Sequence, residues 1–193
     1  MSRNPAADRG REVRQRLLDA AVELIVQRGW TGVSTRTLAE RAGLAAGGVH
    51  YHFPSLPALL AEAAIGAMRP LVEQLDLVLR QAKTPEQGLE LMLGSLAEYT
   101  GMDNTSLLFG ETYLAATRDE RLRAEMGALV DNAAGKVGAW LATHGVAEPE
   151  QTARVLLASI DGLMLHRALN PRLTAQVVAP VLRRVLASAG AQR

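Results

Sequence analysis

The chain has 193 residues, of which 48% are hydrophobic and only 4% aromatic, and its formal net charge is +1. This length allows one domain or two small ones, and the abundance of alanine and leucine favours a helical protein built from slim side chains. Cysteine is absent, which excludes disulfides and thiolate metal sites. No signal-like segment and no run of about 18 uncharged apolar residues occurs, so we expect a cytoplasmic protein without a membrane partner.

Charge is shared unequally between the two parts of the chain. Residues 1–53 contain eight arginines and five acidic residues, a net charge of +3, which leaves −2 for residues 54–193. The basic N-terminal part is compatible with a nucleic-acid partner, although many proteins without such a partner show as large an excess. The asymmetry therefore serves only as support.

The first predicted helix covers residues 11–28. Apolar side chains recur there at helical spacing, and Gly29 provides a C-terminal stop. Residues 1–10 combine proline, glycine and charged side chains without apolar periodicity, so we expect a mobile arm. Arginines in and after this arm could enter a DNA minor groove, although flexible basic tails are common. They are Arg3, Arg9, Arg11 and Arg14.

The segment that begins at Ser34, STRTLAERAGLAAGGVHYHF, is the most informative part of the chain. Ser34 is a good N-cap, although Thr37 is not the Glu or Gln of a full capping box. Ala39 is small enough for close helix contact, and Gly43 falls where a tight turn needs a positive φ. The pattern predicts two short helices, the second over residues 46–52. This is a helix-turn-helix, whose second helix normally lies in the DNA major groove; an ordinary helical hairpin is the alternative.

The rest of the chain predicts six further helices. Capping residues and prolines divide its apolar, helix-favouring sequence into segments of helical length. Pro70 lies inside the first of these helices, one turn after Gly66, and predicts a kink there. The predicted segments are residues 55–81, 85–99, 104–117, 119–144, 149–170 and 174–189.

The N-terminal pattern resembles the DNA-binding domain of the tetracycline-repressor (TetR) family of transcriptional regulators. The similar features are an Ala- and Leu-rich helix that ends at a glycine-aromatic pair, residues 17–30, and the helix-turn-helix that follows it. The run His-Tyr-His-Phe-Pro-Ser at residues 50–55 also resembles the family. Beyond residue 60, only the helical architecture and the Asp161-Gly162-Leu163 segment are similar.

The resemblance implies an all-α fold of about nine helices. It implies a three-helix helix-turn-helix domain over residues 1–54 and a larger helical domain for effector binding and dimerisation over residues 55–193. The expected function is that of a ligand-responsive transcriptional regulator, a repressor, which binds double-stranded operator DNA as a homodimer. A small-molecule inducer would release it. The eighth and ninth helices, residues 149–170 and 174–189, would pair with their copies, and no cofactor or metal is implied.

Candidate DNA contacts lie on both helices of the helix-turn-helix. Thr35 and Arg36 lie near a helix N-terminus, where peptide N–H groups favour a phosphate. By resemblance, Tyr51 and His52 touch phosphates. The full set of candidates is Thr35, Arg36, Thr37, Ala46, Gly47, Gly48, His50, Tyr51 and His52.

The start of the second helix departs from the family. Family members often have a capping Ser or Thr and a Lys or Arg there, whereas this chain has small residues over positions 45–48. Our hypothesis is that the glycines let the backbone approach the groove closely and that small residues contact thymine methyl groups. The opposing hypothesis is that this helix reads little of the DNA sequence.

By the same resemblance, the helices between residues 55 and 144 enclose a small-molecule pocket. The low aromatic content argues against a broad cage for flat cationic drugs and favours a slim aliphatic or polar ligand. Glu111 could complement a positive group on that ligand, or simply face water. The candidate ligand-binding residues are Tyr99, Met102, Phe109, Glu111, Tyr113, Trp140, His144 and Met164.

The sequence has two alternative interpretations. An enzyme is disfavoured, because His50 and His52 at i and i+2 cannot bind one metal from one helix face, and no nucleophile elbow or phosphate-binding glycine loop occurs. The second alternative is a helical protein-interaction adaptor with weak or lost DNA binding. The glycine-rich, uncapped helix over residues 46–52 gives that alternative some weight.

Overall fold

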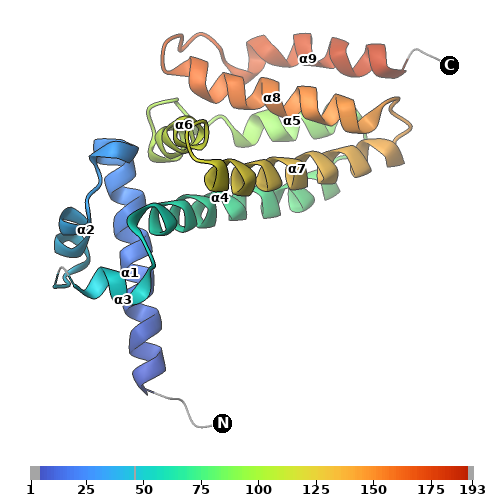
Figure 1. Cartoon of the computed structure of the whole chain (residues 1–193). Helices are drawn as coiled ribbons and strands as arrows, with labels where there is room; N and C mark the ends of the chain where they lie inside the picture. Colours follow the sequence, from blue (N-terminus) through green and yellow to red (C-terminus); the bar gives the residue numbers. More distant parts are fainter. Residues whose placement is uncertain (1–4, 46, 191–193) are drawn as a thin grey trace. The chain divides into compact units, whose positions relative to one another are not determined.

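The computed structural model describes residues 5–45 and 47–190 (Figure 1). Within these residues the chain forms nine α-helices, one 3-10 helix and no strand, which confirms the expected all-α class. The elements are α1 (Pro5–Arg28), η1 (Trp30–Gly32), α2 (Thr35–Ala42), α3 (Gly48–His52), α4 (Leu56–Arg80), α5 (Pro85–Ser95), α6 (Asn104–Ala116), α7 (Glu120–Thr143), α8 (Pro149–Arg167) and α9 (Ala175–Gly190).

Most helices begin where the capping residues predict. The Thr84 hydroxyl accepts a hydrogen bond from the Gln87 N–H at 3.2 Å, and Pro85 occupies the first turn of α5. Asp103 accepts from the Ser106 N–H at 3.0 Å ahead of α6, and Asp119 accepts from an N–H of α7 at 2.9 Å. These side chains satisfy amide groups that a helix start leaves without a partner.

The predicted mobile arm is wrong for residues 5–10, because α1 already begins at Pro5. Proline suits the first turn of a helix, since it has no N–H to satisfy there. Asp8 in the same turn forms an ion pair with Arg11 and complements the positive end of the helix dipole. Arg3 lies outside the described residues.

Three other helix boundaries differ from the prediction. α5 ends at Ser95 rather than near Tyr99, α8 ends at Arg167 rather than at residue 170, and α3 begins at Gly48. α4 is continuous as a helix through Pro70. The kink at that proline stays a prediction.

The chain divides into two compact units. The first contains the residues up to Met68 together with Leu108–Arg123, and the second contains Arg69–Leu107 together with the residues from Ala124 onward. The division therefore passes through α4, α6 and α7. The sequence predicts a functional division into residues 1–54 and 55–193. Its boundary differs from that of the two compact units, and it stays a prediction.

The first unit packs α2 against α1 and joins α3 to α2. Many of its side chains are no more than 1% exposed. On α1, α2 and α3 they include Leu17, Leu24, Ile25, Leu38 and Val49, and Leu59 of α4 is equally buried. The apolar spacing read from the sequence thus lies in the interior of this unit.

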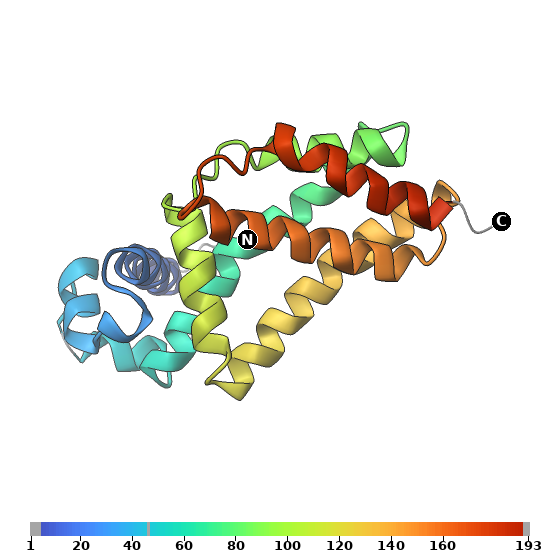
Figure 2. The ribbon, with the colours of Figure 1, turned by 90° about the horizontal axis from the view of Figure 1, so that it is seen from above.

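The core of the second unit joins α5 to α7, α8 and α9, and Figure 2 shows α9 running beside α5 and α8. The Trp140 ring of α7 lies directly over Gly88 of α5. A Cβ atom placed on Gly88 would come within 2.4 Å of the ring. Glycine is therefore what allows α5 to approach this large side chain.

No helix within the described residues combines the length and apolarity needed to cross a lipid bilayer.

The contact between Gly88 and Trp140 can be tested by substitution. We expect Gly88→Ala to lower the free energy of unfolding by about 1–3 kcal/mol, because the added methyl group overpacks the ring. Gly94→Ala in the same helix is the control, since a Cβ atom there meets nothing within 4 Å. Alanine should stabilise that position by up to about 1 kcal/mol through helix propensity. Urea unfolding measures both variants, and equal effects would contradict this packing.

Candidate DNA-binding site

The first helix of the helix-turn-helix begins with a reciprocal cap. The Ser34 hydroxyl accepts a hydrogen bond from the Thr37 N–H at 3.2 Å, and the Thr37 hydroxyl accepts one from the Ser34 N–H at 3.1 Å. The expectation that α2 lacks a full capping box is wrong, because a threonine hydroxyl takes the place of the usual Glu or Gln. The cap fixes the start of α2, where Thr35 and Arg36 lie.

The turn at Gly43 is confirmed. Gly43 has φ 67° and ψ 40°, in the left-handed region that side chains with a Cβ atom disfavour. The Leu44 N–H then donates to the Ala39 carbonyl at 2.9 Å, and the Gly43 N–H donates to the Glu40 carbonyl at 3.3 Å. Ala39 itself is 2% exposed, so its small side chain lies in the close contact that the sequence predicts.

α3 is held to the core at few points. Val49 is 1% exposed, and Phe53, just after the helix, is 3% exposed. No side chain caps the helix at Gly47. A helix of one or two turns is not stable in isolation, so these two buried side chains and the preceding turn hold α3 in place.

The other residues of α3 are exposed or half-buried. Tyr51 is 87% exposed and His50 is exposed, while His52 is half-buried and lies edge-on to the Tyr51 ring at a centroid distance of 5.1 Å. An exposed tyrosine that packs against so little of its own chain is suited to contact a partner. Its hydroxyl and the histidine N–H groups can donate to phosphate oxygens.

The candidates on α2 and around the turn also belong to this unit. The exposed Arg36 forms an ion pair with Glu40 at 2.9 Å, and that hydrogen bond, followed by the charge of Glu40, raises the pKa of Arg36. Thr35 and Thr37 are half-buried, Gly47 is exposed and Gly48 is half-buried. Ala46 lies outside the described residues.

Arg14 has a structural role that the sequence analysis missed. Its guanidinium forms an ion pair with Glu62 of α4 at 2.5 Å and lies over the Phe53 ring, 4.6 Å from the ring centroid. The suggested entry of Arg14 into a minor groove does not fit these contacts. Arg14 instead joins α1 to the end of α3 by an ion pair and a cation–π contact.

Arg41 forms a second unforeseen link in the same unit. It lies in the last turn of α2 and donates to Glu23 at 2.6 Å and to Gln27 at 2.9 Å, both on α1. Only the helical register of Glu23 and Gln27, one turn apart on α1, could have indicated such a contact from the sequence.

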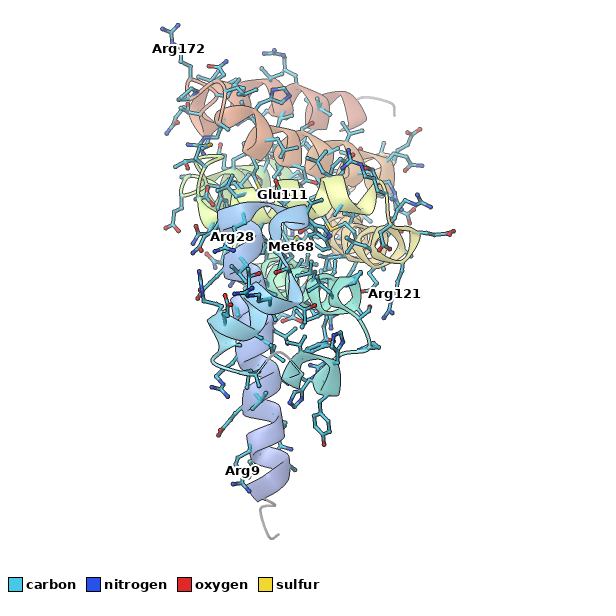
Figure 3. The ribbon with its side chains drawn as sticks, turned by 60° about the vertical axis from the view of Figure 1, so that its left-hand side comes forward. Arg9, Arg28, Met68, Glu111, Arg121 and Arg172 are labelled. Carbon is cyan, nitrogen blue, oxygen red and sulfur yellow. The ribbon has the colours of Figure 1, made fainter. Side chains whose placement is uncertain are left out.

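Glu111, a candidate effector ligand, binds the protein's own backbone. Its carboxylate Oε2 accepts a hydrogen bond from the Trp30 N–H at 2.7 Å. Figure 3 shows Glu111 beside the end of α1 that carries Arg28. The carboxylate thus satisfies an amide in the bend after α1, where Gly29 has φ 74°. Glu111 is half-buried, and its Oε2 already has this partner in the chain.

The other effector candidates fall into two groups, one in each unit. Phe109 and Tyr113 of α6 stack at a centroid distance of 6.4 Å in the first unit. In the second unit the Trp140 and His144 rings lie 4.4 Å apart. The same unit holds the buried Met164 and the mostly exposed Met102.

Tyr99, also in the second unit, is half-buried after α5. Burial raises its pKa, and the nearby charges of Asp103 and Glu98 raise it further. The phenol therefore stays protonated and can donate a hydrogen bond. Within the described residues no group of acidic and histidine side chains is arranged to hold a metal ion.

Comparison with known proteins assigns the family. Residues 17–63 match the family model for bacterial regulatory proteins of the tetR family, and residues 83–188 match the model for a tetracyclin repressor-like C-terminal domain. The chain belongs to the TetR family of transcriptional regulators. Its helix-turn-helix is therefore a DNA-binding element, and its class is that of a regulator and not of an enzyme.

Relatives of this TetR-family chain match either most of its length or about half of it. An uncharacterised HTH-type transcriptional regulator of Mycobacterium tuberculosis (strain H37Rv) is 25% identical over 170 residues, which are 85% of this chain and 87% of the relative. The repressor KstR of Mycolicibacterium smegmatis is 35% identical over 86 residues, 45% of this chain and 42% of its own.

Solved structures have the same fold. The SCO7518 protein of Streptomyces coelicolor A3(2) has a TM-score of 0.76 at 29% identity, and the alignment covers 91% of this chain and 98% of that one. The multidrug binding protein EbrR, in its complex with proflavin, has a TM-score of 0.63 at 31% identity and covers 90% and 99%. Its complex with malachite green gives 0.64 at 30% identity, with coverage of 90% and 97%.

The bond between Glu111 and Trp30 predicts a local change in amide exchange. In Glu111→Ala the Trp30 amide should lose its hydrogen-exchange protection, and the free energy of unfolding should fall by about 1.5–3 kcal/mol, because a charged acceptor is lost. Glu111→Gln should keep part of the protection, since its amide oxygen can accept the same bond. Tyr113→Ala, an exposed position on the same helix, is the control. Unchanged exchange at Trp30 in Glu111→Ala would contradict this contact.

Proposed function

We propose that this TetR-family chain is a ligand-responsive repressor that acts in the cytoplasm, binds operator DNA as a homodimer and is released by a small-molecule inducer. The observation that carries the proposal is the exposed face of α3, with His50 and Tyr51 outward and Val49 buried beneath them. KstR, which is similar to this chain over 86 residues, is named a repressor. EbrR is named a multidrug binding protein, which supports an effector site in this chain.

The DNA contacts that we propose come from the start of α2 and from α3. Thr35, Arg36 and Thr37 would meet phosphates at the capped start of α2, where free peptide N–H groups favour an anion. Arg36 would exchange its surface ion pair with Glu40 for a phosphate, which costs little because exposed pairs of this kind are weak. Tyr51 and His52, together with His50, would position α3 in the major groove.

The glycines of α3 support close approach of the backbone to DNA. A Cβ atom on Gly47 would meet nothing within 4 Å, and one on Gly48 would touch only Leu44 at an ordinary 3.7 Å. The protein's own packing therefore does not require glycine at either position. A partner that comes close to the backbone would explain why glycine stands at both positions. Ala46, another candidate contact, lies between these glycines and the turn in the sequence.

Effector binding is proposed for the candidates whose side chains make no hydrogen bond to any described residue. These are Tyr99, Met102, Phe109, Tyr113 and Met164. Glu111 is bound to the Trp30 N–H, Trp140 is packed on Gly88, and the His144 Nδ1 lies 3.0 Å from the Trp140 carbonyl. For Glu111, Trp140 or His144 to contact an effector directly, these existing contacts within the chain would have to rearrange.

The homodimer is proposed from an apolar surface on the last two helices. Val155, Ala158 and Leu165 recur at helical spacing on α8, on the side away from its buried residues. On α9, Val177 is 57% exposed and Val181 is 49% exposed. Branched apolar side chains in such a row favour burial against a second copy, and two recognition helices would meet two operator half-sites.

An adaptor without DNA binding is the second candidate, favoured by the uncapped start of α3. Binding to DNA from the region upstream of its own gene separates the two functions.

We expect Gly48→Ala to weaken DNA binding by at least about three-fold, since the methyl group would lie at the DNA, while the free energy of unfolding stays equal or rises by up to about 1 kcal/mol. Gly66→Ala on α4 is the control, because a Cβ atom there meets nothing within 4 Å. Tight binding by Gly48→Ala would contradict close approach, and no binding by the unmodified protein would favour the adaptor.

Dimerisation through α8 and α9 predicts the effect of a charge at Val181. Val181→Asp should convert the protein to a monomer in light scattering and reduce operator affinity by more than about ten-fold, because each monomer meets one half-site. Leu77→Asp on α4, 60% exposed, is the matched control and should stay dimeric. A dimeric Val181→Asp variant would show that another surface forms the dimer.

A further inference from the structure

Two exposed arginines of α1 lie on one face of the helix. Arg9 and Arg16 are two helical turns apart in the sequence, so their side chains project from the same side. Neither guanidinium forms an ion pair or a hydrogen bond with any residue that the structure describes. By contrast, the intervening Arg11 and Arg14 are each bound to an acid. Arg9 and Arg16 are therefore free to bind an external anion.

Contacts with α2 and with the turn after it fix the direction of this face. Glu23, a further two turns along α1 from Arg16, forms an ion pair with Arg41 of α2 at 2.6 Å. A Cβ atom on Gly43 would lie 3.9 Å from Nη1 of Arg16, so this guanidinium lies beside the turn of the helix-turn-helix. The row of Arg9, Arg16 and Glu23 therefore follows the side of α1 toward α2 and the turn.

Arg9 lies beyond the helix-turn-helix. Two turns of helix span about 10 Å, so Arg9 is about that far past the level at which Arg16 meets the turn. Figure 1 shows the N-terminal end of α1 extending past α2 and α3, and Figure 3 labels Arg9 at that end. The buried Leu17 and the ion pair of Arg14 fix the rotation of α1. A helix, and not a flexible arm, thus holds Arg9 in this position.

The width of α1 decides which part of a DNA duplex it can contact. A helix with its side chains is about 10–12 Å wide, whereas the minor groove is only about 6 Å wide, so α1 cannot enter that groove as an extended arm does. The major groove is the proposed place of α3. The phosphate backbone remains, and guanidinium groups bind phosphate through paired hydrogen bonds. A separation of about 10 Å lets the two arginines contact different phosphates.

We propose that α1 is a third DNA-contacting element, whose Arg9 and Arg16 bind phosphates of the backbone beside the groove that α3 enters. The inference rests on the proposed operator binding and adds contacts to those of α2 and α3. The exposed Glu12 lies one turn from both arginines and pairs with neither, so its charge opposes the same phosphates. Because phosphate contacts carry no sequence information, these arginines raise the affinity for any duplex and leave the choice of operator unchanged.

The salt dependence of DNA binding tests these contacts. The full-length protein, Arg9→Gln and Arg16→Gln are compared on a duplex from the region upstream of its own gene and on a duplex of random sequence. Each lost phosphate contact should reduce the slope of log affinity against log salt by about 0.9, or by about 1.8 for a dimer. Affinity at low salt should fall by at least about five-fold on both duplexes. Arg28→Gln, the same change at the exposed other end of α1, is the control and should keep the slope.

A variant of opposite sign and a stability measurement complete the test. Glu12→Gln should bind both duplexes at least about two-fold more tightly, because it removes a negative charge beside the phosphates. The arginine variants should unfold at the same urea concentration as the unmodified protein, since both positions are exposed.

An unchanged salt slope in either arginine variant, weaker binding to the upstream duplex alone, or a lower urea midpoint would overturn the inference. Weaker binding by Glu12→Gln would overturn it as well. If the unmodified protein binds DNA and only the slopes stay unchanged, the proposed function stands without this inference. If the unmodified protein binds neither duplex, the proposed function itself is contradicted and the inference falls with it.

Discussion

The left-handed turn at Gly43 is the constraint on which the DNA-binding surface depends. It reverses the chain between α2 and α3 within a few residues, and its two backbone hydrogen bonds close the end of α2. α3 is too short to be stable by itself, so its direction is set by this turn before it and by Val49 and Phe53 beneath it. The exposed Tyr51 can meet a partner only because these contacts leave it outside.

Local signals in the sequence predicted much of this arrangement. Gly43, the caps at Ser34 and Thr84 and the burial of Ala39 each follow from the preferences of one residue and its near neighbours. Contacts between distant residues could not be read in the same way. The links from Arg14 to Glu62 and from Glu111 to the Trp30 N–H join positions far apart in sequence. The residues next to each partner in the sequence do not predict either contact. The early start of α1 was missed because charged, proline-containing segments are also typical of mobile arms.

The candidate effector residues illustrate the same limit. The type of a polar side chain in a helical segment does not reveal whether it already has a partner. Glu111 and His144 have partners in their own chain. Such a partner is a property of the folded chain, which the residue type alone cannot predict.

Operator affinity across substitutions at Gly43 tests the central claim most directly. If a left-handed turn sets the position of α3, affinity should depend on backbone preference and not on side-chain size: Gly43→Asn should stay near the unmodified protein, because asparagine tolerates this conformation. Gly43→Ala and Gly43→Val should bind more weakly, by roughly 5- to 30-fold for a strain of about 1–2 kcal/mol, with valine the weaker. Equal affinity of the alanine, valine and unmodified proteins would contradict the account.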